Sequence, residues 1–190
     1  MSAVVGNDKT GIIRDAGPDD VAAVQAIYAH HVLTGTASFE ETPPDDAEIT
    51  RRMTSAQEQG FPFLVAEKNG TVVAYAYASP FRARPAYRYT TETSVYVEKD
   101  AGGHGIGHAL MIELIARCEA IGLRRMIAVI GDSGNAASIA LHRKVGFNMV
   151  GAVPGSGFKL GRWVDTVYME RPLGEGSTTL PAEKNIETGH

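Results

Sequence analysis

Residues 93–110, TSVYVEKDAGGHGIGHAL, decide the fold of this chain. They predict a β-strand, then a glycine-rich turn, then the first turn of an amphipathic helix. Consecutive backbone N–H groups in such a turn form a concave anion site, and the dipole of the helix N-terminus adds to it. The stretch therefore predicts a site for a phosphorylated ligand.

Two common phosphate-binding patterns do not match the spacing. A P-loop ends in Gly-Lys-Ser/Thr, whereas Gly107 is followed here by His108 and Ala109. The dinucleotide fingerprint needs a third glycine after Gly103 and Gly105, and it closes an early βαβ unit rather than a turn past mid-chain. Both are excluded, and a glycine-rich connection without a ligand remains the alternative.

The turn resembles the pyrophosphate loop of the GNAT superfamily of acetyltransferases, Arg/Gln-x-x-Gly-x-Gly/Ala, entered from a Val-rich strand. The match runs from Gly102 to Gly107, and Gly102 stands where the family usually has Arg or Gln. That departure removes a side-chain contact but leaves the backbone N–H groups available.

A second segment, residues 131–147, resembles the other acetyl-CoA segment of the same superfamily. Asn135 is a good helix N-cap, and Gly146 suits the position after the helix end. The resemblance implies that the Asn135 amide also bonds the pantetheine arm, and both roles are compatible.

Residues 86–97 and 157–165 narrow the resemblance to the phosphinothricin acetyltransferase branch, which includes enzymes acting on methionine sulfoximine and methionine sulfone. The branch carries a Glu before a Ser/Thr-Val-Tyr-Val strand, an Asn…Leu/Met-His element and a late Lys-x-Gly-x-Trp-x-Asp. The resemblance covers residues 12–173 and implies a single-domain α/β fold with a mixed, mostly antiparallel sheet flanked by helices. Together with the aromatic and glycine-rich residues 158–163, it also predicts a homodimer.

Hydrophobic periodicity predicts the same order of elements. We expect a flexible lead over residues 1–11, an acetyltransferase domain over 12–173 and a flexible tail over 174–190, because the tail has little apolar content. An aspartate, Asp19 or Asp20, is expected to cap the first helix, and an aspartate among residues 43–46 is expected to cap the second. Asn69-Gly70 predicts a hairpin turn between two strands. The apolar face of the third helix is expected to consist of Leu110, Met111, Leu114, Ile115, Cys118 and Ile121. The expected strands cover residues 12–13, 63–67, 71–78, 90–98, 126–130, 147–153 and 164–170, and the expected helices begin near residues 20, 45, 106 and 135.

Composition sets looser limits. The chain has 190 residues, a formal net charge of −4 and one cysteine, Cys118, which falls in the apolar register of a helix. The charge and the lack of a basic stripe argue against a nucleic-acid partner. A single cysteine fits a reducing cytoplasm, and no apolar run approaches the ~20 residues that cross a bilayer. We expect a cytoplasmic protein with no membrane partner.

Acetyl transfer to an amine needs a neutral nucleophile and a proton for the departing thiolate. Glu92 is the first candidate for the base, since alternation along the strand puts it on one face with Ser94 and Tyr96. His142 is the second candidate, at the position where many superfamily members have a Tyr that protonates the thiolate. The alternatives are a solvated carboxylate for Glu92 and a hydrogen-bonded structural histidine for His142.

Acetyl-CoA is the expected co-substrate, with no metal. His104 and His108 stand four residues apart, as zinc ligands can, but no third ligand suggests itself. The residues expected to bind the cofactor are Val95, Tyr96, Val97, Gly103, His104, Gly105, Ile106, Gly107, His108, Asn135 and Ser138.

The expected acceptor is a small amino acid or analogue. An arginine at Arg82 or Arg84 can hold a substrate carboxylate bidentately. Tyr87, Phe39 and Glu92 complete the expected acceptor site, with ordinary surface residues as the alternative. Lys159, Trp163 and Asp165 shape the site or an interface as the resemblance implies, and Trp163 equally fits a plain core position.

The predicted function is therefore acetyl-CoA-dependent N-acetylation of a small amino acid or analogue such as phosphinothricin, methionine sulfoximine or methionine sulfone. The alternative is a non-catalytic acyl-CoA-binding or sensing domain on the same scaffold, which the replacement at Gly102 weakly favours. A protein-acetylating enzyme is a third, less favoured choice.

Overall fold

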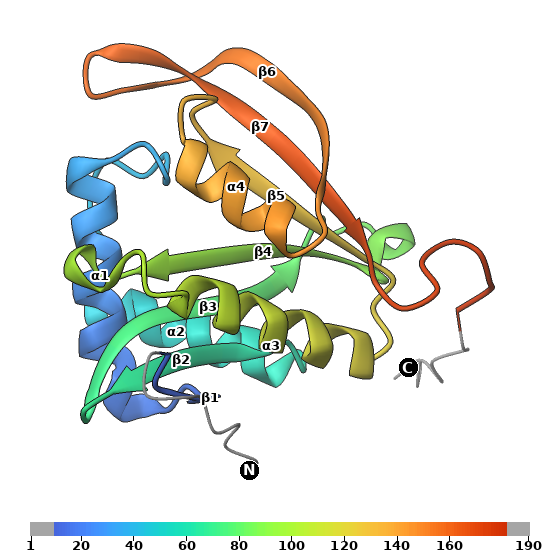
Figure 1. The fold of residues 1–190 in the computed structure, drawn as a ribbon, viewed down its shortest axis with the longest axis horizontal. Coiled ribbons are helices and arrows are strands. Elements are labelled where there is room, and N and C mark those ends of the chain that lie inside the picture. Colours follow the sequence, from blue (N-terminus) through green and yellow to red (C-terminus); the bar gives the residue numbers. More distant parts are fainter. Residues whose placement is uncertain (1–9, 182–190) are drawn as a thin grey trace.

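A computed structural model describes residues 10–181, and these form an α/β fold around one seven-stranded sheet (Figure 1). The strand order is β1-β2-β3-β4-β5-β7-β6, and only the β4–β5 pair is parallel among the described strands. The strands are β1 (Ile12–Asp15), β2 (Phe63–Lys68), β3 (Thr71–Pro80), β4 (Thr90–Val97), β5 (Arg125–Gly131), β6 (Asn148–Lys159) and β7 (Arg162–Pro172). The predicted mixed, mostly antiparallel sheet is confirmed.

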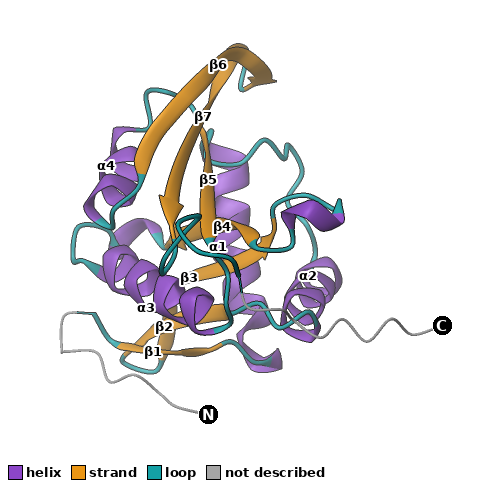
Figure 2. Cartoon of the chain, turned by 90° about the vertical axis from the view of Figure 1, so that its right-hand side faces the viewer, coloured by secondary structure: helices purple, strands orange, loops and turns teal. Residues whose placement is uncertain are grey.

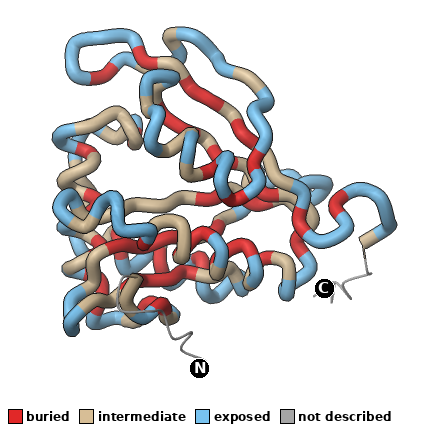
Figure 3. The backbone as a smooth tube through the Cα atoms, in the orientation of Figure 1, coloured by how far each residue is buried: buried red, intermediate tan, exposed pale blue. Residues whose placement is uncertain are grey.

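The sheet separates two pairs of helices (Figure 2). The helices are α1 (Val21–Thr34), α2 (Asp46–Glu58), α3 (Ile106–Ala120) and α4 (Ala136–Lys144), with short 3₁₀ turns η1 (Pro18–Asp20), η2 (Pro85–Tyr87) and η3 (Lys99–Ala101). α3 covers a core that contains Leu110, Leu114 and the buried thiol Cys118, while α1 and α2 cover a core that contains Val24 and Met53. Buried residues follow the central strands and α3, and the tip of the β6–β7 hairpin is largely exposed (Figure 3).

The two halves of the sheet separate between β4 and β5. Their ladder runs from the Thr90–Arg125 pair to the Thr93–Ala128 pair and then stops. β4 continues along β3 as far as Val97, and β5 continues along β7. Because the strands diverge, the backbone of residues 94–97 has no neighbour on its β5 side among the described strands, and a branch opens in the middle of the sheet (Figure 1).

Local chemistry explains several element boundaries. Asn69 and Gly70 both have positive φ, 52° and 78°, as a tight hairpin turn requires. Asp45 caps α2 by accepting the Glu48 N–H at 2.8 Å. These two predictions are confirmed.

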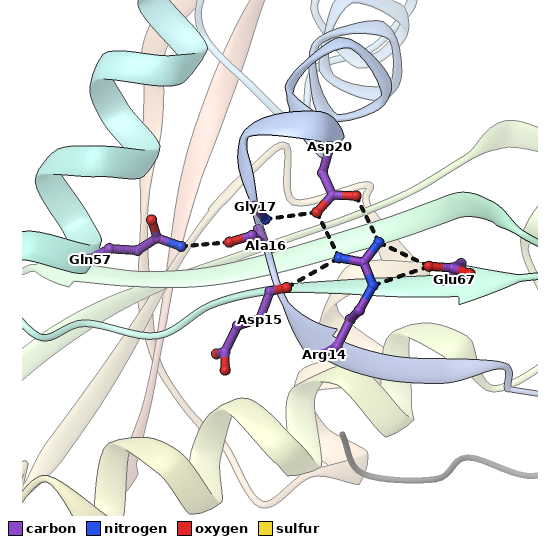
Figure 4. Close-up of polar contacts among 7 residues, drawn as sticks. All are labelled: Arg14, Asp15, Ala16, Gly17, Asp20, Gln57 and Glu67. Carbon is purple, nitrogen blue, oxygen red and sulfur yellow. Dashed lines mark hydrogen bonds and ion pairs between the residues drawn. The ribbon is translucent and has the colours of Figure 1, made fainter. Parts of the chain in front are cut away.

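The predicted aspartate cap of α1 is wrong, because η1 precedes the helix and Asp20 makes no cap hydrogen bond to it. The Asp20 carboxylate instead accepts the Gly17 N–H at 2.8 Å and both terminal nitrogens of Arg14 at 2.7 and 2.8 Å (Figure 4). Arg14 also contacts Glu67 of β2. This ionic network fastens β1 and the start of α1 to the sheet.

The sixth strand was predicted to end at residue 153, and it continues to Lys159. The ladder with β7 resumes after a bulge, at the Gly157–Val164 pair, and this pairing keeps the chain in the sheet beyond residue 153. Trp163 is 69% exposed, so the alternative of a core tryptophan is wrong. Ile121, assigned to the apolar face of α3, lies just past that helix and is also exposed.

The predicted domain limits fall partly outside the described residues, since nothing is described for residues 1–9 and 182–190. Within the predicted tail, Thr179 and Leu180 accept hydrogen bonds from Arg124. Among residues 10–181, no helix is long and apolar enough to cross a membrane.

Candidate acetyl-transfer site

A pocket of about 530 Å³ lies where the end of β4, the glycine loop and α4 meet. Ten of the predicted cofactor residues line this pocket, and His104 does not. Those ten are Val95, Tyr96, Val97, Gly103, Gly105, Ile106, Gly107, His108, Asn135 and Ser138. The assignment of these residues to a cofactor stays a prediction, but the fold does bring them to one place.

The glycine loop has the backbone geometry of an anion cradle. Gly103 and Gly105 have φ of +79° and +82°, and Gly105 is the N-cap of α3. Apart from the adjoining residues, no atom of the described chain lies within 4 Å of where a Cβ would stand at either glycine, so both backbones are open to an incoming group. The free N–H groups of the first helical turn point from the same end. Gly102 is extended and lines the pocket without a side chain.

α4 forms the opposite wall of the pocket. Asn135 begins the helix, and its side-chain oxygen accepts the Ser138 N–H at 3.2 Å. A Cβ at Gly107 would stand 3.3 Å from Val97 and 3.4 Å from Leu141, so α3 approaches both β4 and α4 closely at this glycine. The cap expected of Asn135 is confirmed, and its pantetheine contact stays a prediction.

His142 is buried on α4 and lines a small cavity of about 40 Å³ at the branch, together with Thr93, Ser94 and Ala128. Its Nδ1 lies 2.8 Å from the Ser138 carbonyl oxygen, and because a carbonyl only accepts, Nδ1 carries the proton. Nε2 is buried and has no hydrogen-bond partner among the described residues.

Burial lowers the pKa of His142, so the ring rests neutral with its Nε2 lone pair free. The resting geometry therefore supports a proton acceptor at Nε2. The predicted role as proton donor to the thiolate requires Nε2 to be protonated first, and it stays a prediction.

Glu92 lies on the other face of the sheet. The β3–β4 register is unbroken, so Glu92, Ser94 and Tyr96 share a face with their partners Ser79, Tyr77 and Tyr75. That is the face covered by α1 and α2, whereas α4 and His142 lie on the opposite face. Burial raises the pKa of the half-buried Glu92 carboxyl, and the nearby charge of Arg82 partly offsets this. The two candidate catalytic groups thus approach the branch from opposite faces.

The predicted acceptor residues do not line either cavity. Arg82, Arg84 and Tyr87 are exposed between β3 and β4, with the Arg82 guanidinium 5.0 Å from the Phe81 ring centroid. Phe39 follows α1 and is partly exposed. Arg82 is near enough to Glu92 to act on its charge, and the grouping of the other three around an acceptor stays a prediction.

The Lys-x-Gly-x-Trp-x-Asp motif, residues 159–165, has side chains in different surroundings. Lys159 is buried at the end of β6, where its ammonium donates to the Ser38 carbonyl at 2.6 Å. Asp165 accepts the Gly155 N–H at 2.9 Å and the Ser133 hydroxyl. Trp163 stacks edge-on against Phe158 on the surface.

Sequence reasoning missed two polar residues of the larger pocket. His31 of α1 lines it, and its Nε2 donates to the Val97 carbonyl at 2.8 Å. Lys144 of α4 lines it as well. His31 is distant in sequence and sits in an ordinary helix, so no local signal marks it. Lys144 is in register with Leu141 and Ala140 on α4, and that spacing could have found it.

No group of three or more His, Cys, Asp or Glu side chains within residues 10–181 is arranged to hold a metal ion. His104 and His108 therefore have no third protein ligand in the part of the chain that the structure describes.

Comparison with known proteins agrees with this geometry. The model of the acetyltransferase (GNAT) family matches residues 24–147. A phosphinothricin N-acetyltransferase of Alcaligenes faecalis is 54% identical over 90% of this chain and 85% of its own length. An L-methionine sulfoximine/L-methionine sulfone acetyltransferase of Pseudomonas aeruginosa is 44% identical over 85% of this chain and 94% of its own length.

A solved structure shows the same fold. It is a GNAT phosphinothricin acetyltransferase from Sinorhizobium meliloti in complex with AcCoA. Its TM-score is 0.88 at 47% identity, covering 96% of this chain and 95% of that one.

Proposed function

The chain belongs to the GNAT family of acetyltransferases, and on this premise we propose that it acetylates the amino group of a small amino acid or analogue. Phosphinothricin, methionine sulfoximine and methionine sulfone are the first acceptors to consider, because relatives named for them are 54% and 44% identical over most of the chain. Detoxification of such analogues is the corresponding biological role, and the cytoplasm, where acetyl-CoA is made, is the expected location.

The observation that carries the proposal is the branch between β4 and β5, with the open glycine cradle on one side of it and a half-buried carboxyl on the other. In this reaction the neutral amine forms a C–N bond to the thioester carbonyl carbon of acetyl-CoA, the C–S bond breaks, and coenzyme A leaves as a thiolate that takes up a proton. The N–H groups of residues 103–108 hold the pyrophosphate, and the backbone of residues 95–97, on the side that β5 leaves uncovered, bonds the pantetheine arm. Asn135 and Ser138 close the pocket from α4.

Glu92 removes the proton from the acceptor amine, directly or through a water. An amine is mostly protonated near neutral pH, and a carboxyl of raised pKa is closer to the working pH than an ordinary glutamate. His142 lies at the branch, where its Nε2 can exchange a proton with the reacting groups. Arg82 or Arg84 pairs with the acceptor carboxylate.

We also propose a homodimer. The β6–β7 hairpin carries an exposed apolar surface, the hairpin patch, made of Met149, Val150, Val153, Phe158, Leu160 and Trp163. Exposed apolar side chains concentrated on one hairpin in this way are typical of an interface. Light scattering at micromolar concentration should give a dimer, and Trp163→Asp should shift it to monomer. A monomeric wild-type protein with full activity would rule the dimer out.

A thiol-release assay with acetyl-CoA tests the function across phosphinothricin, methionine sulfoximine, methionine sulfone and ordinary amino acids. We expect turnover with at least one analogue and little with most ordinary amino acids. Calorimetry with acetyl-CoA alone is the companion measurement. Tight binding without acetylation of any amine would favour the acyl-CoA-sensing alternative and overturn the enzymatic one.

A further inference from the structure

Residues 36–39, which we call the crossing segment, connect the two halves of the divided sheet. They follow α1, which packs on the β1–β4 half, and they contact the β5–β7 half. The Thr36 hydroxyl donates to Asp132 at 3.1 Å, just after β5. The Thr36 carbonyl also packs on Gly131, where an added Cβ would stand 1.9 Å from its oxygen. Only glycine fits at position 131 with the segment in this place.

Ser38 is bonded from both sides. Its hydroxyl is 2.8 Å from the Tyr28 hydroxyl of α1, and its carbonyl accepts from the Lys159 ammonium at 2.6 Å. Lys159 is only 3% exposed. Burying an ammonium is expensive unless the group is well bonded, and an apolar side chain of similar length would fill the same space at lower cost. The bond to Ser38 therefore calls for a role other than packing.

Phe39 packs between two glycines of the β5–β7 half. A Cβ at Gly157 would stand 2.9 Å from the Phe39 ring, and one at Gly131 would stand 3.1 Å from it. Ala37, between these anchored residues, lines both cavities at the branch, together with Tyr96, Asn135 and Ser138. The crossing segment is thus part of the wall of both cavities.

We infer that Lys159 is a positioning residue that latches the crossing segment to the β5–β7 half, and that the fit of Phe39 against Gly157 sets the size of acceptor admitted beside Glu92. The inference deepens the proposed function and rests on it for the identity of the acceptor. Lys159 itself does not touch the reacting atoms. It acts through the position of residues 36–39.

Lys159→Met keeps the length of the side chain and removes the donor. We expect the KM for the best acceptor of the panel to rise at least about tenfold, with the KM for acetyl-CoA within about twofold. Backbone amides of residues 36–40 should exchange hydrogen faster. Lys68→Met, at the end of β2, is the control and should change none of these values. An equal rise in KM for both substrates, or unchanged hydrogen exchange at residues 36–40, would overturn the proposed positioning role of Lys159.

Gly157→Ala tests the second contact without touching the lysine. The added methyl must displace the Phe39 ring, so the acceptor KM should again rise while acetyl-CoA binding holds. Adding Phe39→Leu makes room for that methyl, so the double variant should bind the acceptor better than the two single effects predict. Additive effects would contradict the fit between these residues.

The proposed function and the proposed role of Lys159 can be refuted independently of each other. If the wild-type protein acetylates no amine, the proposed function fails, and hydrogen exchange at residues 36–40 still decides whether Lys159 is a latch. If the wild type is active but Lys159→Met leaves the acceptor KM unchanged, the latch has no role in acceptor binding while the function stands.

Discussion

The Arg14 network and the β4–β5 branch differ in how their polar groups are satisfied. At the edge of the sheet, Asp20 accepts three hydrogen bonds and Arg14 spans two carboxylates, so the cluster is closed on itself (Figure 4). At the branch, His142 keeps a buried nitrogen that has no hydrogen-bond partner within residues 10–181, and Glu92 is half-buried with a raised pKa. Satisfied groups stabilise a fold, whereas groups left ready for a ligand cost stability and support chemistry.

Glu92→Gln should have the largest effect, because it removes the candidate base at the β4–β5 branch. It keeps the shape of the side chain but loses the base, so turnover should fall by roughly 10²–10⁴ with acetyl-CoA binding nearly unchanged. Because burial raises the pKa of Glu92, wild-type kcat/KM should fall on the acid side at a pH above the ordinary glutamate value of about 4.3.

The loss in Glu92→Gln should shrink as pH rises, because free amine then forms without help. Glu58→Gln, at an exposed position of α2, serves as the control and should leave kcat and its pH profile intact. Near-normal turnover of Glu92→Gln at neutral pH would move the base to His142 or to an ordered water.

Gly105→Val should have the next largest effect. Its side chain would stand where the cradle is open, and acetyl-CoA affinity should weaken by at least about 100-fold, or about 2.7 kcal/mol. Gly60→Val is a matched control, since Gly60 also has a φ near +80° and open space around its Cβ. Both variants should lose similar stability, and only Gly105→Val should lose binding by calorimetry. Unchanged acetyl-CoA binding in a folded Gly105→Val protein would show that the glycine loop does not hold the pyrophosphate.

Asp20→Asn tests the Arg14 network, in which the polar groups satisfy one another. It leaves Arg14 with a weaker partner and should lower the free energy of unfolding by about 2 kcal/mol at neutral pH, with the kinetics of the remaining folded enzyme preserved. Arg14 lowers the pKa of Asp20 below its unfolded value. The wild-type contribution is therefore present above the unfolded pKa of about 3.9 and is lost as pH falls through the folded one.

Denaturant titrations at several pH values measure this difference. The gap between wild type and Asp20→Asn should narrow steadily below about pH 4. A gap that stayed constant down to pH 2 would show that the network is not what the substitution removes.

Asn135→Ala should have the smallest effect on stability. It distinguishes a helix cap that only stabilises the fold from one that also binds a ligand. Asn135 and Asp45 both cap a helix by accepting the N–H of the third residue on, at 3.2 and 2.8 Å. Either alanine variant should cost about 1 kcal/mol of stability. Only Asn135→Ala should also weaken acetyl-CoA binding, because only that cap lines the pocket. Equal binding in both variants would leave Asn135 as a cap alone.

Local patterns predicted much of this structure. The Asn69-Gly70 turn, the Asp45 and Asn135 caps and the apolar face of α3 depend on residues close in sequence, and each was found from its chemistry. The first helix was placed correctly, but the role of Asp20 was not, because its partners Arg14 and Glu67 lie on two strands. Likewise β6 was cut short, since pairing with β7 rather than propensity keeps residues 157–159 in the sheet.

The sequence by itself determined the glycine cradle, the strand that leads into it, and the alternation that puts Glu92 with Ser94 and Tyr96. These follow from backbone conformations and periodicities that act over a few residues. Only the tertiary structure decided that Glu92 and His142 reach the branch from opposite faces, that His31 bonds Val97, and that a buried Lys159 anchors Ser38. Those contacts join residues 66 and 121 positions apart, and no local pattern encodes a distance that packing alone creates.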